Sequence, residues 1–250
     1  MTNGLARAWR LRTMLPPEWR SRARHVVDAC GRPIGSLHAA SVTGLVGLTV
    51  DDGPDPHWTL PLLDVLAAHG CRATFFVLAY RALRYPDILR ATVAAGHEIA
   101  LHGWDHTRLT ALPPSEVLAR SRHAKAVVED LSGAPVRWFR PPFGAQSLRS
   151  YLAVRRLGME VVVWSATPRD WEDGEPDEVA GRVLADVRDG DILLTHDGVE
   201  VPAGDSAPTF DRAAMFGALL DGLASRGLRA TALENLVRSG PARYTAWFRP

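Results

Sequence analysis

The chain has 250 residues, of which 46% are hydrophobic and 23% are charged, and its formal net charge is +1. This composition is typical of a globular protein with a sizeable core, and the near-zero charge argues against a protein that binds nucleic acid through bulk charge. The two cysteines, Cys30 and Cys71, form no CxxC pair, so the sequence indicates neither a disulfide scaffold nor a thiolate zinc site.

Residues 1–43 differ in composition from the rest of the chain and are predicted to form an N-terminal arm. Arginines interrupt their apolar residues, so we identify neither a signal peptide nor a spanning helix and expect a cytoplasmic protein. Two interpretations of the arm stay open. It packs on or beside the following domain, or it makes a weak peripheral contact with an anionic membrane through Trp9, Trp19 and its basic residues. Those basic residues include Arg7, Arg10, Arg12, Arg20, Arg22 and Arg24.

From residue 44 to residue 250, strands and helices are predicted to alternate without a linker. The predicted strands cover residues 45–50, 72–78, 98–101, 136–139, 160–164, 191–195 and 228–230. The predicted helices cover residues 59–69, 86–95, 114–131, 147–157, 176–188 and 211–226, with a short helix after the last strand. This order is typical of a single parallel α/β domain. Because polar residues follow nearly every strand, we predict a (β/α) barrel with about seven parallel strands rather than an open sheet.

The first predicted strand runs directly into two adjacent carboxylates, Asp51 and Asp52, before a turn at Gly53 and Pro54. An ionised group at the end of a buried strand must meet a cation or shift its pKa. The sequence therefore predicts that a metal ion or an arginine converges on this acid pair.

Candidate partners follow three other predicted strands. His102 and His106 lie four residues apart after the third strand, and with Asp52 they form a ligand set that suits zinc or another divalent metal with open positions. Arg140 begins a rigid Pro-Pro-x-Gly turn, where its guanidinium could hold a carboxylate through two bonds. His196 follows the sixth strand and, if paired with an acid such as Asp170, would be an oriented imidazole able to transfer a proton.

In chain order, the sequences Thr-Val-Asp-Asp-Gly-Pro, His-x-x-x-His, Arg-Pro-Pro-x-Gly, Asp-Trp and Leu-Thr-His resemble the polysaccharide deacetylase family. This family is also called the NodB homology domain or carbohydrate esterase family 4, and the resemblance covers roughly residues 44–238. It implies a distorted barrel, in agreement with the predicted strand order. Val50, Gly103 and Thr167 depart from the family pattern, but none of these departures removes a catalytic group.

The resemblance also implies roles for individual residues. Asp51 would be the general base, oriented by Arg140, and His196 would be the general acid, tuned by Asp170. The implied metal ligands are Asp52, His102 and His106, and the implied substrate-binding residues are Phe143, Trp171 and Leu194. Trp171 and Leu194 would form the walls of an acetyl-methyl pocket, and a backbone N–H near Phe143 would stabilise the oxyanion.

The expected activity is metal-dependent removal of an N-acetyl or N-formyl group from an amino sugar or glycoconjugate, including a biosynthetic or lipid-linked intermediate. Zn²⁺ is the expected ion, with Co²⁺, Ni²⁺, Mn²⁺ or Fe²⁺ as alternatives. Hydrolysis of a cyclic imide or ureide, hydrolysis of an O-acetyl ester, and carbohydrate binding without catalysis stay open. The long polar loop 197–211 is expected to set specificity. The sequence indicates no oligomeric state.

Overall fold

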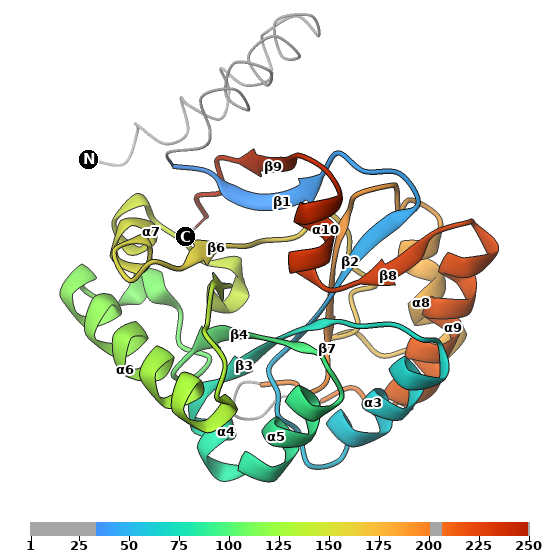
Figure 1. Ribbon diagram of the computed structural model, residues 1–250, viewed down its shortest axis with the longest axis horizontal. Helices are drawn as coiled ribbons and strands as arrows, with labels where there is room; N and C mark the ends of the chain where they lie inside the picture. The colour runs from blue at the N-terminus through green and yellow to red at the C-terminus, as the bar shows by residue number, and fades with distance from the viewer. Residues whose placement is uncertain (1–33, 201–206, 250) are drawn as a thin grey trace, which may run out of the picture.

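The structure is a computed structural model that describes residues 34–200 and 207–249. Most of the predicted arm, residues 1–43, lies outside these ranges, so its packing and its membrane contact stay predictions. Figure 1 shows a curled sheet with helices around its outside. Among the described residues, no helix combines the length and the apolar character that crossing a membrane requires.

The main sheet contains seven strands, and all their pairings are parallel, as predicted. Its order is β6-β5-β4-β3-β2-β7, with β8 paired to the first half of β2. The strands are β2 (Leu45–Asp51), β3 (Thr74–Leu78), β4 (Glu98–Gly103), β5 (Trp138–Phe139), β6 (Glu160–Val161), β7 (Ile192–His196) and β8 (Arg229–Thr231). The helices are α3 (Thr59–Ala68), α4 (Ala79–Arg84), α5 (Pro86–Ala94), α6 (Pro114–Ser132), α7 (Leu148–Arg155), α8 (Pro176–Leu184), α9 (Arg212–Ser225) and α10 (Leu233–Ser239).

Isolated backbone hydrogen bonds, rather than a continuous strand pairing, close the gap between the two ends of the sheet. Residues 37–40 take part, because the N–H of Val163 donates to the carbonyl of Leu37 and the N–H of Ala40 donates to the carbonyl of Gly190, each at 2.8 Å. After β6 the chain crosses to β7, where the N–H of Leu194 donates to the carbonyl of Ala166 at 3.0 Å. This crossing ends β6 at Val161, whereas the sequence predicted a strand over 160–164. The curled sheet is therefore a distorted barrel, and the distortion lies on the side of β6 and β7.

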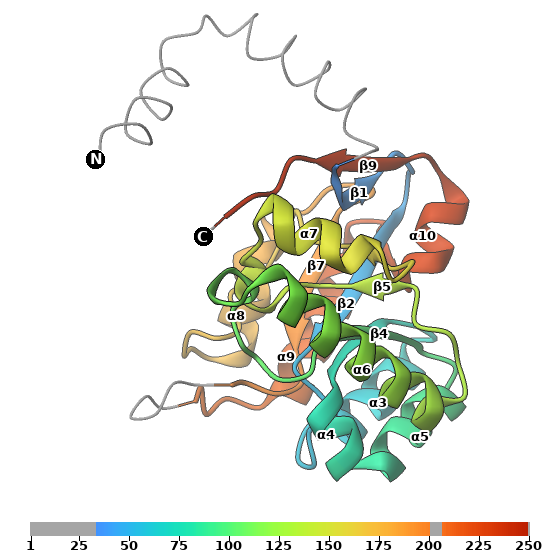
Figure 2. The same cartoon turned by 90° about the vertical axis from the view of Figure 1, so that its left-hand side faces the viewer.

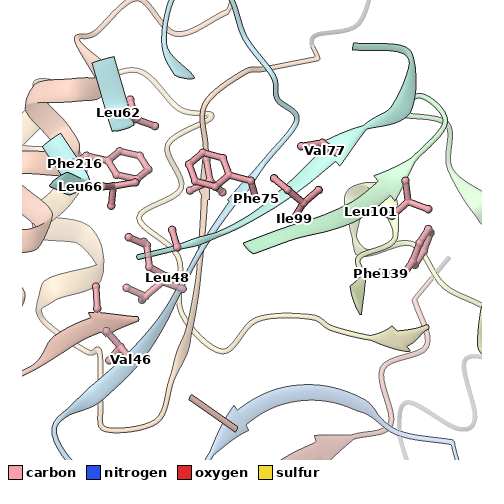
Figure 3. Close-up of a cluster of buried hydrophobic side chains, with 14 of the residues drawn as sticks. Val46, Leu48, Leu62, Leu66, Phe75, Val77, Ile99, Leu101, Phe139 and Phe216 are labelled. Atoms are coloured by element: carbon pink, nitrogen blue, oxygen red, sulfur yellow. The ribbon is translucent and has the colours of Figure 1, made fainter. Parts of the chain in front are cut away.

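Strand β2 pairs with three other strands, β3, β7 and β8, and all seven of its residues are buried. A parallel strand covered on both faces needs apolar residues on both, which explains its nearly continuous apolar sequence. Alternate side chains of the strands enter two clusters. The larger cluster, between the sheet and the helices, is drawn in Figure 3 and includes Leu48, Phe75 and Phe216. The smaller cluster, which includes Phe76 and Ile192, fills the inside of the distorted barrel.

Elements near the two ends of the described chain fill the half of the barrel in which the strands begin. Strand β1 (Ser36–Ala40) pairs with β9 (Ala242–Thr245) in an antiparallel sheet at one end of the molecule (Figure 2). Leu37 and residues of α10 belong to the inner cluster. Gly47 of β2 permits this packing, because a Cβ there would lie 2.9 Å from the side chain of Leu236. The carboxyl ends of the strands are left for polar groups.

Three elements were not predicted. Helix α4 follows β3 without a break and has six residues, too few to show a helical period. Strand β1 falls inside the predicted arm, and β9 lies near the C-terminus. Each of these short strands depends on a partner about 200 residues away in the chain, and local sequence patterns do not encode such pairing.

Candidate active site

The carboxyl ends of β2, β4 and β7 meet around one pocket of about 670 Å³. Parallel pairing places Asp51, the last residue of β2, in register with His196, the last residue of β7. The pocket is lined by Asp51, Asp52, His102, His106, Arg108, Pro141, Phe143, Gly144, Trp164, Trp171, Leu194, His196, Val199 and Glu200. Each of the five sequence motifs therefore contributes at least one residue to this pocket. The Asp-Trp motif contributes Trp171.

Both members of the acid pair reach the pocket because the backbone changes direction between them. Successive side chains of a strand point to opposite faces. Asp52 has a φ of +78°, in the left-handed region, so the alternation stops at the end of β2. A non-glycine residue in this conformation carries a backbone cost of about 1–3 kcal/mol, which is common at functional sites.

Asp52, His102 and His106 form a cluster in which one ligand atom of each lies within 4.8 Å of the others. The Nδ1 atom of His102 lies 2.9 Å from the carbonyl oxygen of Arg140. Because a carbonyl can only accept, Nδ1 carries the proton, and Nε2 keeps its lone pair for the cluster. The same residues are those that the sequence predicts as metal ligands.

The geometry of this cluster fits a divalent cation. Asp52 Oδ1 lies 3.4 Å from Nε2 of His102 and 3.5 Å from Nε2 of His106. Two ligand atoms that are each about 2.1 Å from a tetrahedral ion are about 3.4 Å apart. Asp52 Oδ1 is buried and accepts no hydrogen bond from a described residue. A buried carboxylate oxygen without a partner is costly, and a cation would satisfy it.

The charges of the cluster also suit a metal. Burial raises the pKa of Asp52 to about 7, and it lowers the pKa of His102 to about 3 and the pKa of His106 to about 3. The imidazoles are therefore neutral at physiological pH, which is the form that binds metal ions. A divalent cation beside Asp52 would favour its ionised form.

Asp51 forms a buried ion pair with Arg140. A guanidinium N–H of Arg140 donates to Asp51 Oδ1 at 2.6 Å, and the same nitrogen lies 2.7 Å from the hydroxyl of Thr49. Burial raises the pKa of Asp51, and the guanidinium opposes this increase without cancelling it. Asp51 Oδ2 lies 3.7 Å from Nε2 of His102. A cation in the neighbouring cluster would therefore lower the pKa of Asp51, as Arg140 does.

His196 forms a separate buried ion pair with Asp170. Its Nδ1–H donates to Asp170 Oδ1 at 2.7 Å, and its backbone N–H donates to Asp170 Oδ2 at 2.8 Å. Burial alone would lower the pKa of His196, but the Asp170 carboxylate outweighs burial and raises this pKa to about 9. The ring therefore carries a proton at neutral pH, and a proton held on Nε2 can be donated.

Comparison with known proteins identifies the family. A family model described as polysaccharide deacetylase matches residues 40–162. A chitooligosaccharide deacetylase of Sinorhizobium fredii is 41% identical over 154 residues, which cover 61% of this chain and 72% of that protein. The chain belongs to the polysaccharide deacetylase family.

Two further relatives place the chain within this family. The peptidoglycan-N-acetylmuramic acid deacetylase PdaC of Bacillus subtilis is 36% identical over 155 residues, and the match covers 61% of this chain but only 32% of PdaC. A family 4 carbohydrate esterase from Streptomyces lividans, solved in complex with acetate, is 27% identical with a TM-score of 0.68. That comparison covers 82% of this chain and 99% of the esterase.

The residues predicted to bind substrate line the same pocket of this family member. Phe143 has a φ of +58°, which directs its ring over His106 with centroids 4.1 Å apart. Trp171 is 42% exposed, and its ring meets the ring of His196 edge-on at 5.8 Å. Leu194 is buried and lines the pocket. These positions are compatible with apolar walls around an acyl group.

Gly103, a departure from the family pattern, has a structural reason in this chain. Its φ is +119°, a conformation that side chains rarely adopt, and a Cβ there would lie 3.0 Å from the carbonyl oxygen of Asp105. The loop that carries His106 therefore turns tightly at this glycine. A serine or threonine at this position would require a different backbone path.

Two buried residues beside the site were given no individual role from the sequence. Arg212, at the start of α9, donates to Asp170 Oδ2 at 3.2 Å and to the carbonyl of His196 at 3.1 Å. Asp197 accepts a hydrogen bond from the hydroxyl of Thr59 at 2.5 Å and packs so closely on Gly53 that a Cβ there would lie 2.2 Å away. Asp197 directly follows His196, so its position was a usable signal, whereas nothing local distinguishes Arg212.

Proposed function

We propose that the chain is a metal-dependent N-deacetylase of an amino sugar in a chitooligosaccharide-like or peptidoglycan-like glycan. The observation that supports this proposal is the arrangement of three groups in one pocket. The Asp52, His102 and His106 cluster adjoins the pair of Asp51 with Arg140, and protonated His196 comes from the neighbouring strand. A ligand set, a base and an acid are the groups that hydrolysis of an unactivated amide needs.

We propose Zn²⁺ as the ion, because two imidazoles and one carboxylate with open positions suit zinc. When bound, such an ion polarises an amide carbonyl and lowers the pKa of a coordinated water. Asp51, oriented by Arg140, accepts a proton as water attacks the carbonyl carbon. His196 then donates its Nε2 proton to the departing nitrogen when the carbon–nitrogen bond breaks. The products are acetate and a free amino sugar.

The residues around His196 hold its ring in the orientation that proton donation requires. Asp170 accepts the Nδ1–H of His196, which leaves Nε2 as the atom that can reach the substrate. Arg212 donates to Asp170 and to the backbone of His196 and so holds both partners in place. Phe143, Trp171 and Leu194 would exclude water from the space around the acetyl group.

The test is acetate release from N-acetylglucosamine oligomers and from peptidoglycan fragments, measured before and after treatment with a chelator. We expect release that stops with the chelator and returns when Zn²⁺ is added. The panel should include an O-acetylated sugar, an N-formylated sugar and a cyclic imide. Turnover of the imide alone would contradict the proposal, and binding of a glycan without turnover of any compound would indicate a non-catalytic relative.

A further inference from the structure

One wall of the pocket is formed by Val199 and Glu200, which lie outside the five motifs but inside the loop 197–211 that the sequence predicts to set specificity. Both residues follow Asp197 in the segment after β7. The side chain of Glu200 is 29% exposed, and its carboxylate lies against helix α4. Helix α4 was not predicted from the sequence, so this wall depends on tertiary structure.

One oxygen of Glu200 is held by two neighbouring side chains of α4. The Nε–H of Arg81 donates to Glu200 Oε1 at 3.0 Å, and the hydroxyl of Tyr80 donates to the same oxygen. The second oxygen, Oε2, accepts no hydrogen bond from any residue in the described part of the chain. A carboxylate fixed in this way has one oxygen that can still accept a hydrogen bond from a ligand. It also loses little further side-chain entropy when the ligand binds.

Arg81 also connects this wall to the acid pair. Its NH1 group donates to Asp55 Oδ2 at 3.0 Å, and Asp55 belongs to the turn that follows Asp51 and Asp52. The side chains of Arg81 and Asp55 are each only 15% exposed. Gly198 leaves the space that Arg81 occupies, because a Cβ there would lie 2.7 Å from the guanidinium. Arg81 is therefore a largely buried link between the turn after the acid pair and the segment 197–200.

The chemistry of Glu200 indicates what it binds. The reaction proposed for the site already has a base in Asp51 and an acid in His196, so a third carboxylate is not needed for proton transfer. Glu200 lines the pocket, and a carboxylate there can accept hydrogen bonds from hydroxyl groups, of which a sugar presents several. The acetyl group itself offers no hydroxyl.

We propose that Glu200 is a specificity-determining residue that binds a hydroxyl group of the sugar, with Arg81 and Tyr80 as its positioning residues. This inference rests on the proposed function. It predicts that the pocket distinguishes an acetylated sugar from a small acetylated compound, because only the sugar can use Glu200. The discrimination comes from helix α4 and the segment after β7.

The test compares two substrates in each of several variants. The substrates are an N-acetylglucosamine oligomer and 4-nitrophenyl acetate, which has no sugar hydroxyl. We expect Glu200→Ala to lower the ratio of kcat/KM for the oligomer to kcat/KM for the aryl ester about tenfold, mainly through KM for the oligomer. Glu200→Gln keeps an acceptor for Arg81 and Tyr80 and should lower the ratio less. Tyr80→Phe should act in the same direction with a smaller effect.

The control is Glu178→Gln, which changes an exposed acid on α8 outside the pocket and should leave the ratio unchanged. Bound metal per chain and the melting temperature are measured for every variant. If Glu200→Ala lowers both activities equally, or lowers neither, Glu200 does not bind the sugar and the inference is wrong. A wild-type chain that uses neither substrate at full metal content would instead contradict the proposed function. If the wild type is active on the oligomer, the proposed function stands and only the role of Glu200 is in question.

Discussion

The two sides of the pocket use the same residue types in opposite electrostatic states. On the metal side, burial lowers the pKa of His102 to about 3 and raises the pKa of Asp52 to about 7. On the acid side, Asp170 raises the pKa of His196 to about 9, while His196 and Arg212 lower the pKa of Asp170 against the effect of burial.

The difference comes from the partners that each side supplies. Asp170 has an imidazolium and a guanidinium within hydrogen-bonding distance, so its charge is satisfied by the protein. Asp52 Oδ1 accepts no hydrogen bond from a described residue and faces two neutral imidazoles. One side is therefore a complete ion-pair network, and the other has the charge and geometry of a network that a cation completes.

The largest effect is expected from a change that breaks the metal side. His102→Ala removes one of the three proposed ligands, and we expect loss of stoichiometric metal binding together with loss of activity. Metal content by elemental analysis and acetate release measure the two losses. A variant that keeps both would show that His102 is not a ligand.

Asp51→Asn should separate catalysis from metal binding. The amide cannot accept a proton from water, so we expect turnover to fall about 10²–10⁴-fold while metal content is unchanged. The proposed ligands Asp52, His102 and His106 are untouched by this change. Loss of the metal together with activity would indicate that Asp51 holds the ion rather than acting as the base.

Asp170→Asn should change the pH dependence that His196 controls. His196, the proposed general acid, would act while protonated, so wild-type turnover should decline only as pH rises through about 9. Without the Asp170 carboxylate, the pKa of His196 falls and the decline begins at lower pH. Activity profiles on the oligomer, whose departing nitrogen must be protonated, test this shift, and an unchanged basic limb would contradict the role of His196.

The same variant should alter stability with a defined sign. The pKa of His196 is raised from its ordinary 6.5 to about 9 on folding, so its pairing stabilises the protein fully below about pH 6.5. This contribution is lost as pH rises through about 9. The pKa of Asp170 is lowered on folding, so its contribution is present above its ordinary 3.8 and lost as pH falls. The wild type should therefore exceed Asp170→Asn in melting temperature most between about pH 4 and pH 6.5.

Arg212→Met should have the smallest effect on activity and a clear effect on stability. Arg212 is 2% exposed, and its removal leaves Asp170 with fewer donors in a buried site. We expect less than a tenfold loss of kcat and a destabilisation of about 3 kcal/mol. Arg188→Met, at an exposed arginine, is the matched control. Equal melting temperatures for the two variants would show that Arg212 does not stabilise the acid side.

Much of the site could be predicted from the sequence because its residues follow strands directly. Asp51, His102, Arg140 and His196 each lie at or just beyond the end of a strand. The carboxyl ends of parallel strands meet at one edge of a sheet, so their proximity follows once the strand order is recognised. The parallel barrel was correctly predicted for the same reason, and the family was correctly predicted from the order of the five motifs.

Other features were decided only by tertiary structure. The sequence placed an arginine near Asp51, but the direction of that carboxyl's pKa depends on the depth of burial, which no local pattern gives. Arg212 reaches Asp170 across 42 residues, and Arg81 reaches Glu200 across 119 residues. Neither arginine lies in a motif, because each works through a contact made by folding. The chain itself therefore determines which groups do the chemistry, whereas long-range packing determines how those groups are charged, held and matched to a substrate.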